Sequence, residues 1–230
     1  MSRLTVPTRP GRAGKHQTAR VLPRRYHHGN LRAALLAAAI KIVDQRGADG
    51  LTIRLVAQQA GVSHNAPYHH FRDKGAILEA ATVSCINALV DVMCDKQKKT
   101  QGGSVDKIIA MGVEFVRFAI EHPAEFRLMY RPELRKSRDG CCGDAPSSPV
   151  EGASASGRNL LLQIIRGGQD AGEIVPGDPD MLVLTWWCLV NGYANKVLNL
   201  QHKRSRICDK KALATAHQLL VHLAIGMRLE

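Results

Sequence analysis

The sequence predicts an all-α protein, with three short helices near the N-terminus and a larger helical bundle after them. Apolar residues recur at three- and four-residue intervals along most of the chain, which is the period of an α-helix. Residues that commonly start or end helices flank these stretches. No stretch alternates apolar and polar residues in the manner of a half-buried strand. Since 45% of the 230 residues are hydrophobic, the chain can bury the core of one large domain or of two smaller ones.

The three N-terminal helices are expected within residues 26–75, which we define as the head. Thr52 is placed to cap the second helix, because a threonine oxygen can accept a hydrogen bond from a backbone N–H of the first turn. Gly61 follows that helix and can adopt the positive φ of a tight turn. Ser63 can cap a third helix that runs to about His70. Two short helices joined by such a corner have the geometry of a helix-turn-helix.

The remaining residues, 76–230, are predicted to form a helical bundle, which we define as the body. Asp73 is placed to cap a long helix, and Gly102-Gly103 ends it. Ser104 opens the next helix, which ends at His122-Pro123. Several long helices in succession predict a bundle with a shared apolar core.

The second half of the body contains one expected loop and three expected helices. Residues 136–157 are rich in Gly, Ser, Ala and Pro, so a mobile loop is expected there, followed by a helix over 158–171. Asp178-Pro179 is a capping residue followed by proline at the first helical position, which predicts a helix over 179–200. The last helix, 208–227, carries apolar residues at alternating three- and four-residue steps, a seam suited to packing against a partner helix.

Positive charge is concentrated at the N-terminus. The formal net charge is +12, and residues 1–30 contain seven Lys or Arg and no acidic residue. We interpret residues 1–25 as a basic, disordered arm. Such an arm suits a polyanion, because each phosphate that it neutralises releases counterions. Composition alone agrees equally well with a solubilising tail.

The apolar runs and the cysteines indicate a cytoplasmic protein. No signal peptide is visible, and the longest apolar run, Met181–Val190, is shorter than the roughly 18 residues of a membrane span. The six cysteines show no CxxC pair and no zinc-ligand spacing, so we interpret them as small core residues. No membrane partner, metal or cofactor is expected. Cys141-Cys142, in the expected loop, is compatible with an inert pair and with a sensor of thiol-reactive agents or soft metals.

The most informative segment is 52–74, with the sequence TIRLVAQQAGVSHNAPYHHFRDK. The second helix of a helix-turn-helix lies in the major groove of DNA. Here that helix exposes hydrogen-bonding side chains and no acidic ones, namely Ser63, His64, Asn65, Tyr68, His69 and His70. An enzyme is disfavoured because no nucleophile elbow or other catalytic motif occurs. A non-specific nucleic-acid binder is disfavoured because the few aromatic residues fall mostly in the body.

The same segment resembles the TetR family of bacterial regulators, whose head signature is close to T-I-R-x-x-A-x-x-A-G-V-S-x-x-x-x-Y-x-x-F-x-x-K. The matching residues are Thr52, Ile53, Arg54, Ala57, Ala60, Gly61, Val62, Ser63, Tyr68, Phe71 and Lys74. The resemblance covers about residues 26–95. The body is similar to the branch of the family with a C-terminal Trp-His-Gly motif. The corresponding stretch here runs from Trp187 to Gly192, and Asn191 stands in the place of the histidine.

The resemblance implies a role for each exposed residue of the head. Tyr68, His70 and Lys74 would contact phosphates, and Thr52 and Arg54 would hold the DNA backbone. His64, Asn65 and His69 would face base edges, where an asparagine can pair with adenine and a histidine can donate to guanine. Arg24 and Arg25 are placed either to reach the minor groove or to remain solvated.

The resemblance also implies an effector pocket and a homodimer. Candidates for the pocket, for each of which packing in the core is the favoured alternative, are Phe115, Phe118, Met129, Trp186, Trp187 and Tyr193. Candidates for the dimer interface, on helices 179–200 and 208–227, are Trp186, Val190, Leu213, Leu220, Leu223 and Met227. The expected protein is a ligand-responsive repressor that binds a near-palindromic operator in double-stranded DNA as a homodimer and is released by a small molecule.

Overall fold

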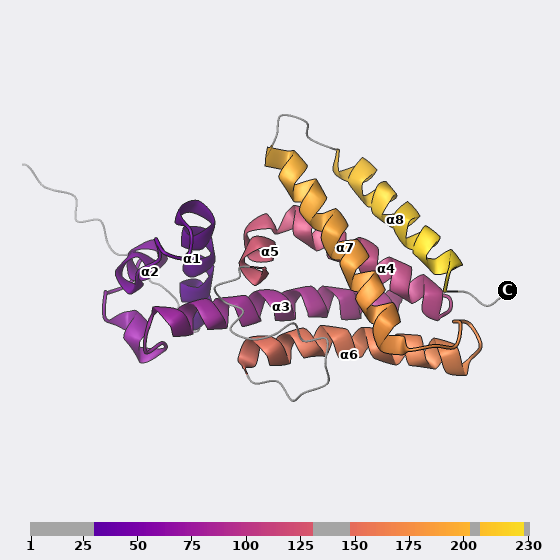
Figure 1. Ribbon diagram of the computed structural model, residues 1–230. Helices are drawn as coiled ribbons and strands as arrows, with labels where there is room; N and C mark the ends of the chain where they lie inside the picture. Colours follow the sequence, from indigo (N-terminus) through magenta and orange to yellow (C-terminus); the bar gives the residue numbers. More distant parts are fainter. Residues whose placement is uncertain (1–29, 131–147, 203–207, 228–230) are drawn as a thin grey trace, which may run out of the picture. The chain divides into compact units, whose positions relative to one another are not determined.

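The computed structural model describes residues 30–130, 148–202 and 208–227, and within these ranges every regular element is helical (Figure 1). This confirms the predicted all-α class. Residues 32–230 form one unit of contacts, and the arrangement below lies within it. The elements in chain order are α1 (Leu31–Arg46), α2 (Ile53–Ala60), the 3-10 turn η1 (Ala66–His69), α3 (Lys74–Lys99), α4 (Ser104–Glu121), α5 (Pro123–Met129), α6 (Pro149–Asp170), α7 (Pro179–His202) and α8 (Asp209–Ile225).

The caps predicted at Thr52 and Asp73 are confirmed, whereas the cap predicted at Ser63 is wrong, because the 3-10 turn η1 follows Asn65 and has no side-chain cap. The Thr52 hydroxyl oxygen accepts a hydrogen bond from the Leu55 N–H at 3.2 Å and so starts α2. Asp73 starts α3 in the same way, because its carboxylate accepts from the Ala76 N–H at 2.8 Å. Gly61 ends α2 with φ 70° and ψ 31°, in the left-handed region that favours glycine. These short local contacts fix the boundaries of α2 and the start of α3.

Gly61 offers a direct test of the corner, because a Cβ added there meets no atom within 4 Å. Gly61→Ala therefore costs only backbone strain, and we expect it to lower the free energy of unfolding by about 1 kcal/mol. Gly152 is the control, since it lies in helix α6 with equally open surroundings. Gly152→Ala should leave stability unchanged or raise it by up to about 1 kcal/mol. Chemical denaturation measures the free energy of unfolding of both variants. Equal changes in the two would contradict the backbone strain that we assign to alanine at position 61.

The loop expected over 136–157 is wrong in its second part. Helix α6 begins at Pro149, nine residues before the predicted start at 158, while residues 136–147 lie outside the described ranges. The Ser148 hydroxyl accepts from the Glu151 N–H at 3.2 Å, and proline follows at the first helical position. Glycine and serine are weak helix formers. Packing of α6 against α3 offsets that weakness, with Ala153 and Gly157 buried.

Helix α4 lies at the centre of the body and contacts α3, α7 and α8 (Figure 1). Gly112 permits the close approach of α7 and α8 to α4. A Cβ added at Gly112 would lie 2.6 Å from Leu220 Cδ1 and 3.2 Å from Val190 Cγ1. Leu220 and Val190 are 2% and 1% exposed. The apolar seam of α8 therefore packs against α4 of the same chain and not against a partner chain.

Among the described residues, one helix, α3, is long and apolar enough to cross a membrane by length and composition. It packs against α4, α5 and α6, and its buried side chains include Ile77, Leu78, Ala81, Cys85, Ile86, Leu89 and Met93. Packing within the bundle thus accounts for its apolar character.

Candidate nucleic-acid interface

The helix predicted over residues 63–70, which we name the recognition turn, is shorter and tighter than expected. Its only regular part is the 3-10 turn η1. The Tyr68 N–H donates to Asn65 O at 3.1 Å and the His70 N–H donates to Pro67 O at 2.9 Å, so both bonds span three residues. Pro67 has no N–H to donate to Ser63, and it disfavours helical dihedrals at the residue before it. The prediction of a helix that runs from Ser63 to about His70 was therefore wrong, because Pro67 interrupts its hydrogen bonds.

The recognition turn presents its polar side chains to solvent. Pro67 and Phe71 are buried, Phe71 with 4% exposed, and they anchor the turn in the head core. The polar residues proposed from the sequence are all exposed, namely Ser63, His64, Asn65, Tyr68, His69 and His70. Tyr68 is 56% exposed, which is unusual for so large a side chain. One continuous segment therefore offers hydroxyl, amide and imidazole groups with no acidic side chain among them.

Three further residues predicted to contact DNA lie on either side of the recognition turn in the sequence. Thr52 and Arg54 are exposed at the start of α2. The Lys74 ammonium donates to the main-chain oxygen of Asp49 at 3.2 Å, so it also holds the loop between α1 and α2. An ammonium has three donors, which leaves two for a phosphate. Arg24 and Arg25 lie outside the described residues.

Two further cations of the head were missed by the sequence analysis. The Arg32 guanidinium lies 5.5 Å from the centre of the Phe71 ring, a cation–π contact. Arg72 pairs with Asp73 at 3.1 Å, and its side chain is 87% exposed. The sequence alone does not identify Arg32 as a candidate, because its contact with the distant Phe71 ring forms only in the folded head. Arg72 lies within segment 52–74, so its cationic side chain is a signal that the sequence offers.

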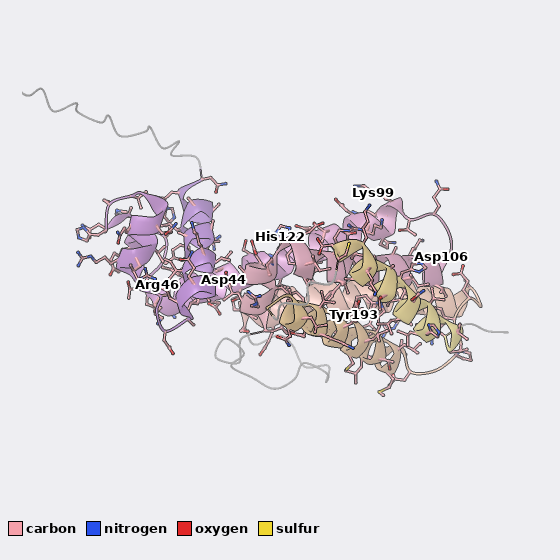
Figure 2. All side chains as sticks on the ribbon, turned by 90° about the horizontal axis from the view of Figure 1, so that it is seen from above. Asp44, Arg46, Lys99, Asp106, His122 and Tyr193 are labelled. Carbon is pink, nitrogen blue, oxygen red and sulfur yellow. The ribbon has the colours of Figure 1, made fainter. Side chains whose placement is uncertain are left out.

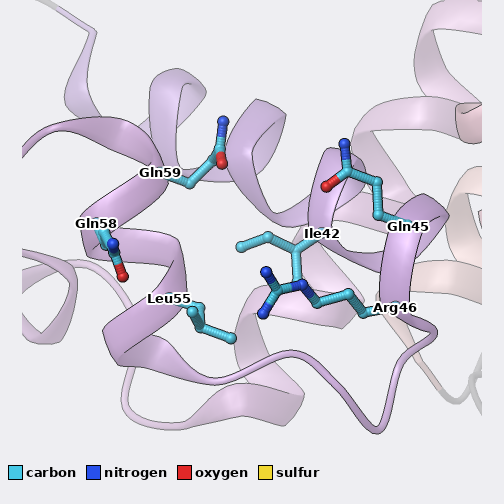
Figure 3. A pocket seen from close by; sticks show the side chains of 6 residues that line it. All are labelled: Ile42, Gln45, Arg46, Leu55, Gln58 and Gln59. Atoms are coloured by element: carbon cyan, nitrogen blue, oxygen red, sulfur yellow. The ribbon is translucent and has the colours of Figure 1, made fainter.

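A groove of about 290 Å³ lies between α1 and α2 (Figure 3). Three amide side chains, one guanidinium and two apolar side chains line it, namely Gln45, Gln58, Gln59, Arg46, Ile42 and Leu55. Figure 3 shows the Arg46 side chain turned across the groove beside Ile42. The groove is a polar surface of the head that is distinct from the recognition turn.

The body contains a much smaller space, which we name the body hollow. Its volume is about 30 Å³, and α3, α5, α6 and α7 enclose it. The lining residues are Ile86, Leu89, Val90, Met93, Met129, Tyr130, Ser154, Gly157 and Trp187. A hollow of this size has room for a few water molecules at most, whereas pockets for drug-sized molecules start at about 300 Å³. The hollow is therefore too small to hold a drug-sized molecule.

Two of the six pocket candidates, Met129 and Trp187, line the hollow. Phe115 and Trp186 are fully buried in an aromatic cluster in which their ring centres are 6.1 Å apart. The Trp186 indole N–H donates to Ile108 O at 3.2 Å. Phe118 is also buried, and Tyr193, on α7 (Figure 2), donates its hydroxyl to Ala212 O at 3.0 Å. The structure thus uses these four side chains as packing and bracing residues of the bundle.

The choice of dimer residues needs correction. Four of the six candidates are buried within the chain and offer no surface to a partner, namely Trp186, Val190, Leu220 and Met227. Leu213 and Leu223 are half-buried. Among the residues of α7 and α8 whose burial the structure describes, the large apolar side chains that are exposed are Met181 (56%), Leu184 (36%) and Ile225 (67%), and we name these three the exposed apolar patch. The sequence pattern identified apolar helices but not which side faces outward.

The expectation that the cysteines are core residues holds for only part of the set. Cys85 is buried, and burial raises the pKa of its thiol to about 12, with the Glu125 carboxylate as the second cause. Cys85 therefore remains an unreactive thiol at neutral pH. Cys188 and Cys208 are exposed, contrary to the expectation. Cys141-Cys142 lies outside the described residues.

The fold and the recognition turn define the class of protein, an all-α protein with a helix-turn-helix head on a helical body. Two sequence profiles identify the family. The profile described as "Bacterial regulatory proteins, tetR family" matches residues 35–81, and the profile "Tetracyclin repressor-like, C-terminal domain" matches residues 108–220. The chain belongs to the TetR family. The second profile fits the branch indicated by the stretch from Trp187 to Gly192.

One relative is a regulator of similar sequence in the head, and solved structures share the fold. The HTH-type transcriptional regulator BetI of Pseudomonas paraeruginosa is 40% identical over 58 residues, which are 25% of this chain and 29% of BetI. The match thus spans less than a third of that relative's length. Among solved structures, a protein of unknown function from Rhodococcus sp. RHA1 has a TM-score of 0.70 and 29% identity, covering 90% of this chain and all of that one. The regulator FadR from Bacillus subtilis, in complex with stearoyl-CoA, has a TM-score of 0.67 at 17% identity and covers 84% of this chain and 98% of FadR. The family is one of regulators, which confirms the expectation of a regulator and not an enzyme.

Proposed function

We propose that this chain is a cytoplasmic repressor that binds a near-palindromic operator as a homodimer and releases it when a small molecule binds the body. The observation that carries the proposal is the recognition turn. Its exposed amide, imidazole and hydroxyl groups form one surface, held by the buried Pro67 and Phe71. Such groups can contact base edges and phosphates together. The buried anchor residues hold the turn in place, which lowers the entropic cost of ordering its side chains on DNA.

A homodimer is part of the proposal, because one turn of this size makes too small an interface for tight, specific binding. The exposed apolar patch is the surface that we assign to the partner. A two-fold axis brings the same patch of each copy together and buries its side chains. The same axis relates the two heads and so demands two similar half-sites in the DNA, one helical turn or more apart.

Response to a ligand requires that the body and the head be coupled. Helix α5 is a candidate for this role, because it contributes Met129 to the hollow and Arg127 to an ion pair with Asp44 of α1. The nitrogen and oxygen atoms of the pair are 3.1 Å apart, and Figure 2 shows Asp44 on the head. A ligand that displaces Met129 would move α5 and strain this pair. The operator affinity could then fall by a factor no larger than the ratio of the ligand's affinities for the displaced state and for the original state.

The pair can be tested with DNA alone. Both side chains are 36% exposed, so the interaction is screened, and we expect a coupling of up to about 1 kcal/mol. A double-mutant cycle with Asp44→Asn and Arg127→Gln, read as operator affinity, measures it. A coupling indistinguishable from zero would exclude this contact as a link between α5 and the head.

Selection of bound duplexes from a random pool tests the proposed function. The full chain is expected to enrich two inverted half-sites. A matched variant with His64→Ala, Asn65→Ala and Tyr68→Ala keeps the buried anchors and is expected to enrich nothing. Enrichment of the same sites by the variant would show that the recognition turn is not the reading surface.

A further inference from the structure

We infer that the groove between α1 and α2 binds a small organic carboxylate that also carries a hydrogen-bonding group and an apolar side chain. The groove lies in the head, so this site is separate from the ligand response that we propose for the body and does not depend on it. Three features of the lining lead to this chemistry, namely one positive charge, three amide side chains and two apolar side chains.

The positive charge is the guanidinium of Arg46, the one charged group among the six lining residues. Arg46 is exposed and takes part in no ion pair within the described part of the chain. The acidic residue nearest to it in the sequence, Asp44, is paired with Arg127 of α5 at 3.1 Å. Arg46 is therefore available to an anion from solution.

The geometry and the size of this charge favour a carboxylate. A guanidinium presents parallel N–H donors that match the two oxygens of a carboxylate or of a phosphate. A phosphate monoester carries a charge of about −1.5 to −2 at neutral pH, whereas a carboxylate carries a single charge. Because the lining supplies one cation, the carboxylate is the better electrostatic match.

The three amide side chains of the lining are Gln45, Gln58 and Gln59. All three are exposed, and the structure gives their side chains no hydrogen bond to another described residue. Figure 3 shows Gln45 on the α1 side of the groove and the other two on the α2 side. Each amide has two N–H donors and one acceptor oxygen. A ligand group that both donates and accepts, such as an amide or a hydroxyl, can therefore replace the water that these side chains bind in solution.

The apolar part of the groove is formed by Ile42, which is 5% exposed, and by Leu55, which is half-buried. Figure 3 shows both side chains pointing into the space between the two helices, as the Arg46 side chain does. An alkyl group placed here leaves water and contacts both residues. The volume of about 290 Å³ lies at the low end for small-molecule sites, so the groove suits one small ligand and not a folded partner.

Four related probes test the inference on the full chain. N-acetyl-L-leucine carries all three features, whereas N-acetyl-L-leucinamide lacks the charge, isocaproate lacks the amide and N-acetylglycine lacks the apolar side chain. Binding is followed by NMR through the side-chain amide signals of the glutamines. We expect N-acetyl-L-leucine to bind about 10-fold more tightly than its amide, because a charge-assisted contact is lost, and about 3-fold more tightly than each of the other two.

Two pairs of variants with matched charge changes locate the site. Arg46→Gln should remove the preference for N-acetyl-L-leucine over its amide, and Gln59→Glu should repel the carboxylate and abolish its binding. Arg166→Gln and Gln163→Glu make the same changes at exposed positions of α6 and should alter neither. In the parent protein, the amide signals of the three groove glutamines should shift on titration, while that of Gln163 should stay in place.

Inorganic phosphate serves as the control for a site that takes any anion. An affinity for phosphate as high as that for N-acetyl-L-leucine would overturn the inference. Equal affinities for N-acetyl-L-leucine and its amide would do the same, as would unshifted groove glutamines with every probe at up to about 10 mM.

Folding and DNA binding are measured on the same samples. All four variants change exposed side chains and should keep the helical circular dichroism of the parent. If a variant fails to fold, the probe series on the parent protein decides. A failure of the probes to bind leaves the proposed DNA binding intact, whereas loss of operator binding by the parent protein contradicts that function and leaves the groove site standing.

Discussion

Leu220→Asp is expected to unfold the chain. Leu220 is 2% exposed and packs against Gly112, at the crossing of α4 and α8. Loss of a buried leucine costs about 2–5 kcal/mol, and the carboxylate adds the cost of a buried polar group without a partner. The sum rivals the whole stability of a domain of ordinary size, about 5–15 kcal/mol. Circular dichroism and chemical denaturation should show a largely unfolded or strongly destabilised protein.

An aspartate placed in the exposed apolar patch should prevent dimerisation and leave the fold intact. Ile225 is 67% exposed and Leu184 is 36% exposed, so Ile225→Asp and Leu184→Asp should change the stability of the isolated chain by only about 0.5 kcal/mol. We expect both variants to sediment as folded monomers. Asn195→Asp, at an exposed polar position of α7, should remain dimeric. A folded Leu220→Asp protein would refute the packing of α8, and dimers of both patch variants would place the interface elsewhere.

Asn65→Ala is expected to lower the preference for the operator over scrambled DNA by about 10- to 100-fold, which corresponds to one lost bidentate base contact of about 1–3 kcal/mol. Binding to scrambled DNA should change little. Asn65 is exposed and caps nothing with its side chain, so its loss should not disturb the fold. Fluorescence anisotropy with the two duplexes measures both affinities.

Tyr68→Phe and Lys74→Ala should show the opposite pattern, with similar losses on both duplexes, because hydroxyl and ammonium groups contact phosphates that every sequence shares. Lys74→Ala should also lower the slope of log affinity against log salt by about 1. Lys74 holds Asp49 O as well, so denaturation must accompany that measurement. Equal losses on both duplexes for all three variants would contradict the division between base and phosphate contacts.

The sequence predicted those parts of the fold that depend on neighbouring residues. The Thr52 and Asp73 caps and the Gly61 corner are local, so their residue types determine them. The 3-10 geometry of the recognition turn was also locally determined. It was missed because the consequence of a proline at position 67 for the bonds on either side was underestimated.

The other differences are tertiary. An apolar seam such as that of α8 has the same sequence pattern whether it packs within a chain or between chains, and only the three-dimensional contact of Leu220 with Gly112 distinguishes the two. The early start of α6 depends on its packing against α3, which local propensity does not contain. The hollow likewise arises from four helices, three of which are distant from one another in sequence.

The affinity of the full chain for the selected duplex, relative to a scrambled duplex of the same composition, tests the central claim most directly. At about 0.15 M salt, sequence-specific regulators bind their sites at least about 1,000-fold more tightly than other DNA. We expect a ratio of that order, with two chains bound to each duplex. Equal affinities for the two duplexes would contradict the account.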